Sequence, residues 1–143
     1  APPERFESDE ELINPAIAKA QTRAAIGFLK RGDYRSAAAL FRSASDHGDA
    51  RAETNLGWMY VLGQSLPRDD QRAVFLFRTA AAQGFPNAQD SLGWMYQHGR
   101  GVEKDGSIAM GWYQRAAAQG FDKAVANFAA MRREGWSPRR EGR

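Results

Sequence analysis

The chain of 143 residues contains no cysteine, so disulfides, thiolate nucleophiles and cysteine zinc sites are excluded. No apolar run approaches the roughly 20 residues that a helix needs to cross a bilayer. There are only two histidines, His47 and His98, and neither has neighbours with the spacing of a catalytic triad or a metal site. We therefore expect no catalytic residue, no metal and no cofactor.

The chain has little charge of one sign, with a net charge of +3. This modest excess does not indicate a nucleic-acid-binding protein. Charge is unevenly distributed between the two ends of the chain. The charged residues of segment 1–12 are acidic apart from Arg5, whereas residues 132–143 carry five arginines. Both ends are expected to be solvated segments outside the folded domain. Arginines in a coil are only a weak signal for phosphate, so no nucleic-acid partner is expected.

An initiator methionine is also missing, since the chain begins Ala1-Pro2-Pro3. We expect that an upstream segment was removed, either a signal peptide or a stretch trimmed from the protein. An exported, periplasmic bacterial protein is the preferred expectation, with the cytoplasm as the alternative.

What the chain does have is an internal repeat. Residues 56–88 and 92–124 both begin LGWMY and end AAAQGF followed by three residues, and fifteen of their thirty-three positions are identical at an offset of 36. A period of this length is typical of helical repeat proteins. No stretch alternates apolar and polar residues, so no sheet is expected.

Capping residues and glycines predict an all-α chain of about seven helices. Asn14 and Pro15 start the first helix, and Asp33, Asp69 and Asp105 lie 36 residues apart at later helix starts, where N-capping explains them. The expected helices run from Pro15 to Gly32, from Tyr34 to about Asp46, from Asp49 to Gly63, from about Asp70 to Gln83, up to His98, from about Gly106 to Gln119, and from Asp122 to near Gly135.

The residues kept in both copies have packing roles. Leu56, Gly57 and Tyr60 share one helix face, and Gly57 allows the second helix of its pair to approach where a Cβ would push it away. Ala73 and Phe77 have the matching spacing on that second helix. In the first unit the nearest counterpart of Gly57 is Gly27, only 30 residues earlier, so the first helix is shifted there.

The pattern A…LGxxYxxGxGVxxDxxxAxxWYxxAAxxG resembles the Sel1-like repeat, a relative of the tetratricopeptide repeat. Residues 88–120 fit it nearly throughout, whereas the second unit has GQSLP in its loop and the short KRGDY turn of the first is closer to a tetratricopeptide repeat. The resemblance implies a right-handed α-α superhelix, or solenoid, that acts as an adaptor or scaffold for other proteins. It covers one tetratricopeptide-like unit, two Sel1-like repeats and a C-terminal capping helix.

The expected organisation is an acidic arm, a helical repeat domain and a basic tail. The arm is residues 1–13, the repeat domain is residues 14–135, and the tail is residues 136–143. The units of the domain are about 14–48, 49–84 and 85–120, and the cap is 121–135.

Trp58 and Trp94 are the residues that stacking of the repeats explains least. Each lies about 140–200° around its helix from the core-facing leucine and tyrosine. The resemblance implies that first helices line the concave side, where Phe28, Trp58 and Trp94 would form a ladder of anchors. The alternative is that each tryptophan packs between helices. The predicted partner-binding groove consists of Phe28, Thr54, Asn55, Trp58, Val61, Asp90, Ser91, Trp94, Gln97, Asn127 and Arg133.

The sequence thus favours a non-catalytic module, monomeric by itself, that binds a protein or peptide partner on its concave groove. Trp58→Ala combined with Trp94→Ala is then expected to abolish binding and to leave helical content and melting nearly unchanged. One alternative is an assembly subunit that docks through its arm and tail onto a larger complex, reaching a membrane only indirectly. Another is glycan or peptidoglycan binding by an exported protein. An enzyme would need a convergent nucleophile and base, and the sequence offers none.

Overall fold

The computed structural model describes residues 14–142, which form seven α-helices and, within that range, no strand. The helices are α2 (Pro15–Lys30), α3 (Tyr34–Asp46), α4 (Ala50–Leu62), α5 (Asp70–Ala82), α6 (Pro86–His98), α7 (Gly106–Ala117) and α8 (Asp122–Arg133). The predicted all-α array is confirmed. The predicted acidic arm, residues 1–13, lies outside the described residues. Each helix from residue 14 onward is too short or too polar to span a bilayer.

The helix starts follow the predicted capping chemistry. The side chain of Asn14 accepts from the backbone N–H of Ala16 at 3.0 Å. Asp33, Asp69 and Asp105 each accept from the backbone N–H three residues later, at 3.0–3.1 Å. These bonds satisfy amide groups that the first turn of a helix leaves unpaired, so the regular spacing of the three aspartates is explained by capping.

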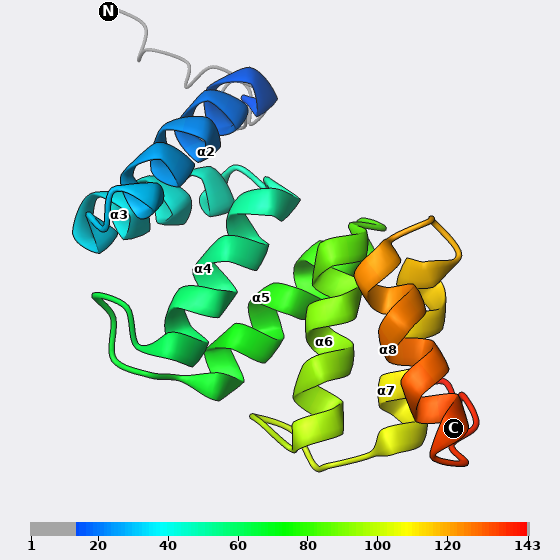
Figure 1. Cartoon of the computed structure of the whole chain (residues 1–143). Helices are drawn as coiled ribbons and strands as arrows, with labels where there is room; N and C mark the ends of the chain where they lie inside the picture. The colour runs from blue at the N-terminus through cyan, green and yellow to red at the C-terminus, as the bar shows by residue number, and fades with distance from the viewer. Residues whose placement is uncertain (1–13, 143) are drawn as a thin grey trace, which may run out of the picture.

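The helices pack in chain order as a solenoid of antiparallel pairs, and each contacts the next along the sequence. In Figure 1 α4, α6 and α8 lie on the near side of the array, with α5 and α7 behind them. α4 also contacts α6 directly. The first helices of successive units therefore form one side of the molecule, and the second helices form the other.

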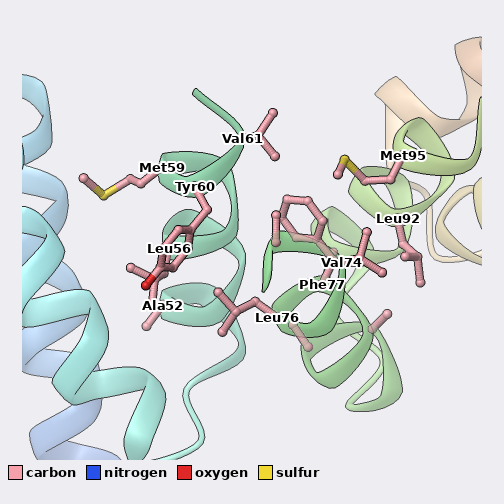
Figure 2. Close-up of a cluster of buried hydrophobic side chains, with 14 of the residues drawn as sticks. Ala52, Leu56, Met59, Tyr60, Val61, Val74, Leu76, Phe77, Leu92 and Met95 are labelled. Carbon is pink, nitrogen blue, oxygen red and sulfur yellow. The ribbon is translucent and has the colours of Figure 1, made fainter. Parts of the chain in front are cut away.

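Close approach within a pair depends on two glycines. A Cβ built on Gly57 would lie 2.5 Å from Cε1 of Phe77, and one on Gly93 would lie 2.8 Å from the ring of Tyr113. Figure 2 shows the Phe77 ring of α5 in the cluster that joins α4 to α6. A Cβ on Gly27, by contrast, would meet nothing within 4 Å. The sequence alignment of Gly27 with Gly57 therefore does not extend to their packing.

Residues 136–142 do not leave the domain but lie along the outer side of α7. The backbone N–H of Arg139 donates to the carbonyl of Ser107 at 2.9 Å, and Arg139 also pairs with Asp105. Gly106 and Gly111 provide the space, because Cβ atoms there would lie 2.7 Å from the Trp136 ring and 2.5 Å from the Arg139 carbonyl oxygen. The tail expected to be solvated is thus attached to α7 at several points.

Candidate partner-binding site

A hollow of about 270 Å³ lies where α4 and α6 face each other, and we call it the α4–α6 groove. It contains five of the predicted site residues together with side chains from the ends of α2 and α8. Its lining residues are Ile26, Arg51, Thr54, Asn55, Trp58, Phe85, Asn87, Asp90, Ser91, Phe121 and Lys123. Aromatic rings, amides and both signs of charge therefore meet in one concave surface, the composition typical of recognition sites.

Trp58 forms the junction between α4 and α6. Its indole Nε1 donates to the Ser91 hydroxyl at 2.8 Å, and its ring centroid lies 5.4 Å from those of Trp94 and Phe77. The side chain is half-buried. The hydrogen-bonded edge is packed between helices, while the remainder lines the groove. Its role as an anchor for a partner stays a prediction.

Trp94 has its own set of contacts on α6. His98 stacks on it at 4.2 Å, and the Arg100 guanidinium lies 5.6 Å from its centroid. Trp94 is half-buried, and its indole N–H has no acceptor within residues 14–142. A bound partner could therefore receive a hydrogen bond from this group at no cost to the fold.

Asp90 is the acidic group of the groove and is only 4% exposed. One carboxylate oxygen accepts from Nδ2 of Asn127 at 2.9 Å, which connects α6 to α8. Burial raises the pKa of Asp90, and the bond from Asn127 and the charge of Lys123 only partly oppose that effect. A buried carboxylate with a second oxygen still able to accept is suited to a donor group of a ligand.

The other predicted residues lie around the groove or away from it. Thr54 and Val61 are buried, and the Thr54 hydroxyl bonds to a carbonyl of its own helix. Gln97 accepts from the Tyr113 hydroxyl at 2.6 Å. Arg133 is exposed near the end of α8. Thr54 belongs to the lining of the groove, whereas Val61, Gln97 and Arg133 lie outside the hollow itself.

Phe28 does not continue the tryptophan pair. It is half-buried near the end of α2, with the Arg31 guanidinium 4.8 Å from its ring centroid. Within residues 14–142 its ring makes no contact with the ring of Trp58. Of the three rings predicted to form a ladder, Trp58 and Trp94 are in contact, and Phe28 is separate from them.

Sequence reasoning missed six residues of the lining, and two of them had a signal. Phe85 and Phe121 each follow the repeated segment AAAQG, 36 residues apart, at the start of a first helix. An aromatic residue repeated at that position was available as an indication of a shared surface. The other four residues missed are Ile26, Arg51, Asn87 and Lys123.

The sequence model of the Sel1 repeat matches three consecutive segments, residues 18–49, 50–85 and 86–121. The chain belongs to the Sel1 repeat family. The match includes the first unit, so the unit predicted to be tetratricopeptide-like is a Sel1 repeat as well. Sel1 repeat proteins are generally non-catalytic protein-interaction modules.

Solved structures of Sel1 repeat proteins share this fold. A Sel1 repeat protein from Oxalobacter formigenes is 35% identical, with a TM-score of 0.70 over 79% of this chain and 88% of that one. A protective antigen with an SLR fold from uropathogenic Escherichia coli is 29% identical, with a TM-score of 0.77 over 82% of this chain but only 26% of its own length.

Cysteine-rich protein B of Helicobacter pylori shares the fold at 15% identity, with a TM-score of 0.60 over 76% of this chain and 92% of its own. A search of functionally curated proteins finds no match. The Sel1 repeats thus account for the architecture, and the groove must be interpreted from its own side chains.

Proposed function

We propose that this Sel1 repeat chain binds an extended peptide segment of a protein partner in the α4–α6 groove and catalyses no reaction itself. The observation that carries the proposal is the hollow between two first helices, lined by Trp58, Phe85 and Phe121 and by the polar groups of Asn55, Asn87 and Asp90. Aromatic side chains give a peptide contact area, and amides and a carboxylate give its backbone donors and acceptors.

The polar groups retain capacity for a ligand. Nδ2 of Asn55 donates to the Arg51 carbonyl at 2.9 Å, which leaves its side-chain oxygen unused. Asn87 is exposed, and its side chain has no hydrogen bond within residues 14–142. Side-chain amides that are not engaged by the fold are the groups from which an extended backbone obtains its hydrogen bonds.

Two other functions remain as alternatives with distinct consequences. Docking of the chain as an assembly subunit through its tail would use residues 136–142, which lie on α7 on the side away from the groove. Glycan binding by an exported protein would use the aromatic rings of the groove itself. Docking through the tail should not change when groove residues are substituted. Glycan binding should be weakened by the same substitutions, but the ligand would be a glycan and not a peptide.

Asn55→Ala combined with Asn87→Ala is expected to weaken peptide binding about thirtyfold, because each amide contributes about 1 kcal/mol as a hydrogen-bonding group. Peptides selected from a random phage-displayed library on the full chain serve as probes, and their affinities are measured by calorimetry. The matched control removes two exposed amides from second helices, Gln71→Ala with Gln114→Ala, and is expected to leave affinity unchanged.

Several outcomes oppose the proposal. Selected peptides that bind the amide variant as tightly as the wild type place binding elsewhere, and loss of binding on removal of residues 136–143 alone favours the tail. Displacement of the peptides by peptidoglycan fragments favours the glycan alternative. The paired Trp58→Ala and Trp94→Ala changes should also abolish binding. Because they remove contacts between α4 and α6, we now expect the melting temperature to fall, in contrast to the unchanged melting expected from the sequence.

A further inference from the structure

The outer side of the array holds a carboxylate site that the chain fills itself. Glu141, from the segment that lies on α7, pairs with the Arg78 guanidinium of α5 and accepts from the Tyr96 hydroxyl of α6. Arg78 also donates to that hydroxyl at 2.7 Å. An arginine and a tyrosine from adjacent helices thus hold one carboxylate, with a charge-assisted hydrogen bond from the guanidinium.

The preceding unit repeats the arginine and the tyrosine. Arg42 and Tyr60 are the residues 36 positions before Arg78 and Tyr96, and Arg42 donates to the Tyr60 hydroxyl at 3.4 Å. Figure 2 shows the hydroxyl oxygen of Tyr60 on the side of α4 nearest α3, the helix that carries Arg42. The two units therefore present the same pair of groups at equivalent places.

The preceding unit differs in having a second arginine at its tyrosine. Arg72 of α5 donates to the Tyr60 hydroxyl at 3.2 Å, whereas the residue 36 positions later is Ile108. Neither Arg42 nor Arg72 has a salt bridge within residues 14–142. Two guanidinium groups thus meet at one phenol oxygen without an anion between them.

The two tyrosines reflect this difference. Burial pushes the pKa of Tyr60 upward, but the two arginines outweigh it and the pKa is lowered. Burial and the Glu141 carboxylate raise the pKa of Tyr96 despite Arg78. The surroundings of Tyr60 therefore favour negative charge, as expected for a site whose anion is not part of the fold.

A hollow of about 410 Å³ opens beside the cluster, between α3 and α5. Phe75, which is 67% exposed, forms part of its wall. The acidic residues of the wall are Asp46 and Glu53, and Glu53 is bonded to Gln83. The surface thus offers room, an exposed aromatic ring and two arginines that form no salt bridge with any acid of residues 14–142.

We propose that Arg42, Tyr60 and Arg72 bind a side-chain carboxylate of an acidic peptide segment from a partner protein, at a second site on the side opposite the α4–α6 groove. The ligand class follows from the equivalent site, which holds a glutamate. An apolar residue next to the acidic residue of the bound peptide packs on the Phe75 ring. Arginine forks on a carboxylate give both affinity and orientation.

The tail of a second copy of this chain does not fit in the same pose. Gly106 and Gly111, which make room for Trp136 and Arg139, correspond to Asp70 and Phe75 in the preceding unit. Asp70 is occupied by Arg100 at 2.7 Å, and Phe75 has a large side chain at the position where Gly111 leaves room for the tail backbone. Only the carboxylate contact is common to the two units, so a different peptide is expected.

The test uses a fluorescein-labelled peptide, Gly-Phe-Glu-Glu-Phe-Glu-Gly, and its counterpart with glutamine for each glutamate. Binding to the full chain is measured by fluorescence anisotropy at physiological ionic strength. Arg42→Gln with Arg72→Gln is expected to weaken binding of the glutamate peptide about a hundredfold or more, because each lost hydrogen bond to the charged group weakens binding about tenfold or more. Arg72→Ile alone, which copies Ile108, is expected to cause a smaller loss in the same direction.

The matched control, Arg23→Gln with Arg35→Gln, removes the same charge from exposed positions on α2 and α3 and is expected to leave binding nearly unchanged. Equal losses in the two double variants would overturn the proposal, since general attraction would then explain the binding. Equal affinity for the glutamine peptide would also overturn it. So would tighter, arginine-dependent binding of a single-stranded oligonucleotide, because the ligand would then be a phosphate backbone.

Discussion

Gly57→Val is expected to unfold much of the helical array at temperatures where the wild-type chain remains folded. A Cβ at this position would lie 2.5–3.0 Å from three atoms of the Phe77 ring, closer than van der Waals contact allows. Phe77 is fully buried, so its ring cannot move aside without displacing its neighbours. Overpacking of this kind costs about 1–3 kcal/mol or more, and thermal melting followed by circular dichroism measures it.

Gly27→Ala is the control for that experiment. Gly27 also lies inside a helix, but a Cβ there meets nothing within 4 Å. Alanine is favoured over glycine in a helix by about 1 kcal/mol, so this change should leave stability unaltered or raise it slightly. Equal destabilisation by the two changes would mean that a general cost of replacing a helical glycine, and not the contact with Phe77, decides the outcome.

The helix bounds were predictable because their signals are local. Capping by Asn14, Asp33, Asp69 and Asp105 depends on residues within three positions, and the sequence contains both partners. The close approach at Gly57 was predictable for a different reason: the repeat displays the same glycine twice, opposite a ring in each unit. A repeated pattern carries information about contacts that a single segment does not.

The rest of the site depends on contacts that the repeat does not encode. Phe28 was assigned to the ladder because it follows Gly27 as Trp58 follows Gly57. Gly27, however, does not face an aromatic ring of the next helix as Gly57 faces Phe77, so the two helices are not packed in the same register. The attachment of residues 136–142 rests on Gly106 and Gly111, positions at which the third unit departs from the second. Where one unit differs from the other, the repeat gives no second copy from which to infer a contact. The attachment of the tail to α7 could therefore not be predicted from the sequence.

Comparison of units also explains a buried acid. Glu53 is 3% exposed, and its carboxylate accepts from Nε2 of Gln83 at 2.7 Å. The equivalent residue in the next unit is Gln89, which accepts from Nε2 of Gln119 at 3.0 Å. The same hydrogen bond is therefore made by a neutral side chain in one unit and by an ionisable one in the other.

Glu53→Gln is accordingly expected to stabilise the protein above neutral pH. Burial raises the pKa of Glu53 to about 7, against an ordinary value of 4.5, although the bond from Gln83 opposes that rise. Between these two values the folded chain keeps a proton that the unfolded chain releases, so stability is greatest below pH 4.5 and is lost as the pH rises through about 7. The difference corresponds to about 3 kcal/mol at most, and glutamine removes it.

Urea unfolding of the wild type and the variant at pH 5 and pH 8 measures this effect. The variant should gain stability over the wild type at pH 8 and gain much less at pH 5, and subtracting one chain from the other cancels every other titrating group. Glu103→Gln makes the same change at an exposed position and should show no such difference. A gain of equal size at both pH values would show that ionisation of Glu53 is not its cause.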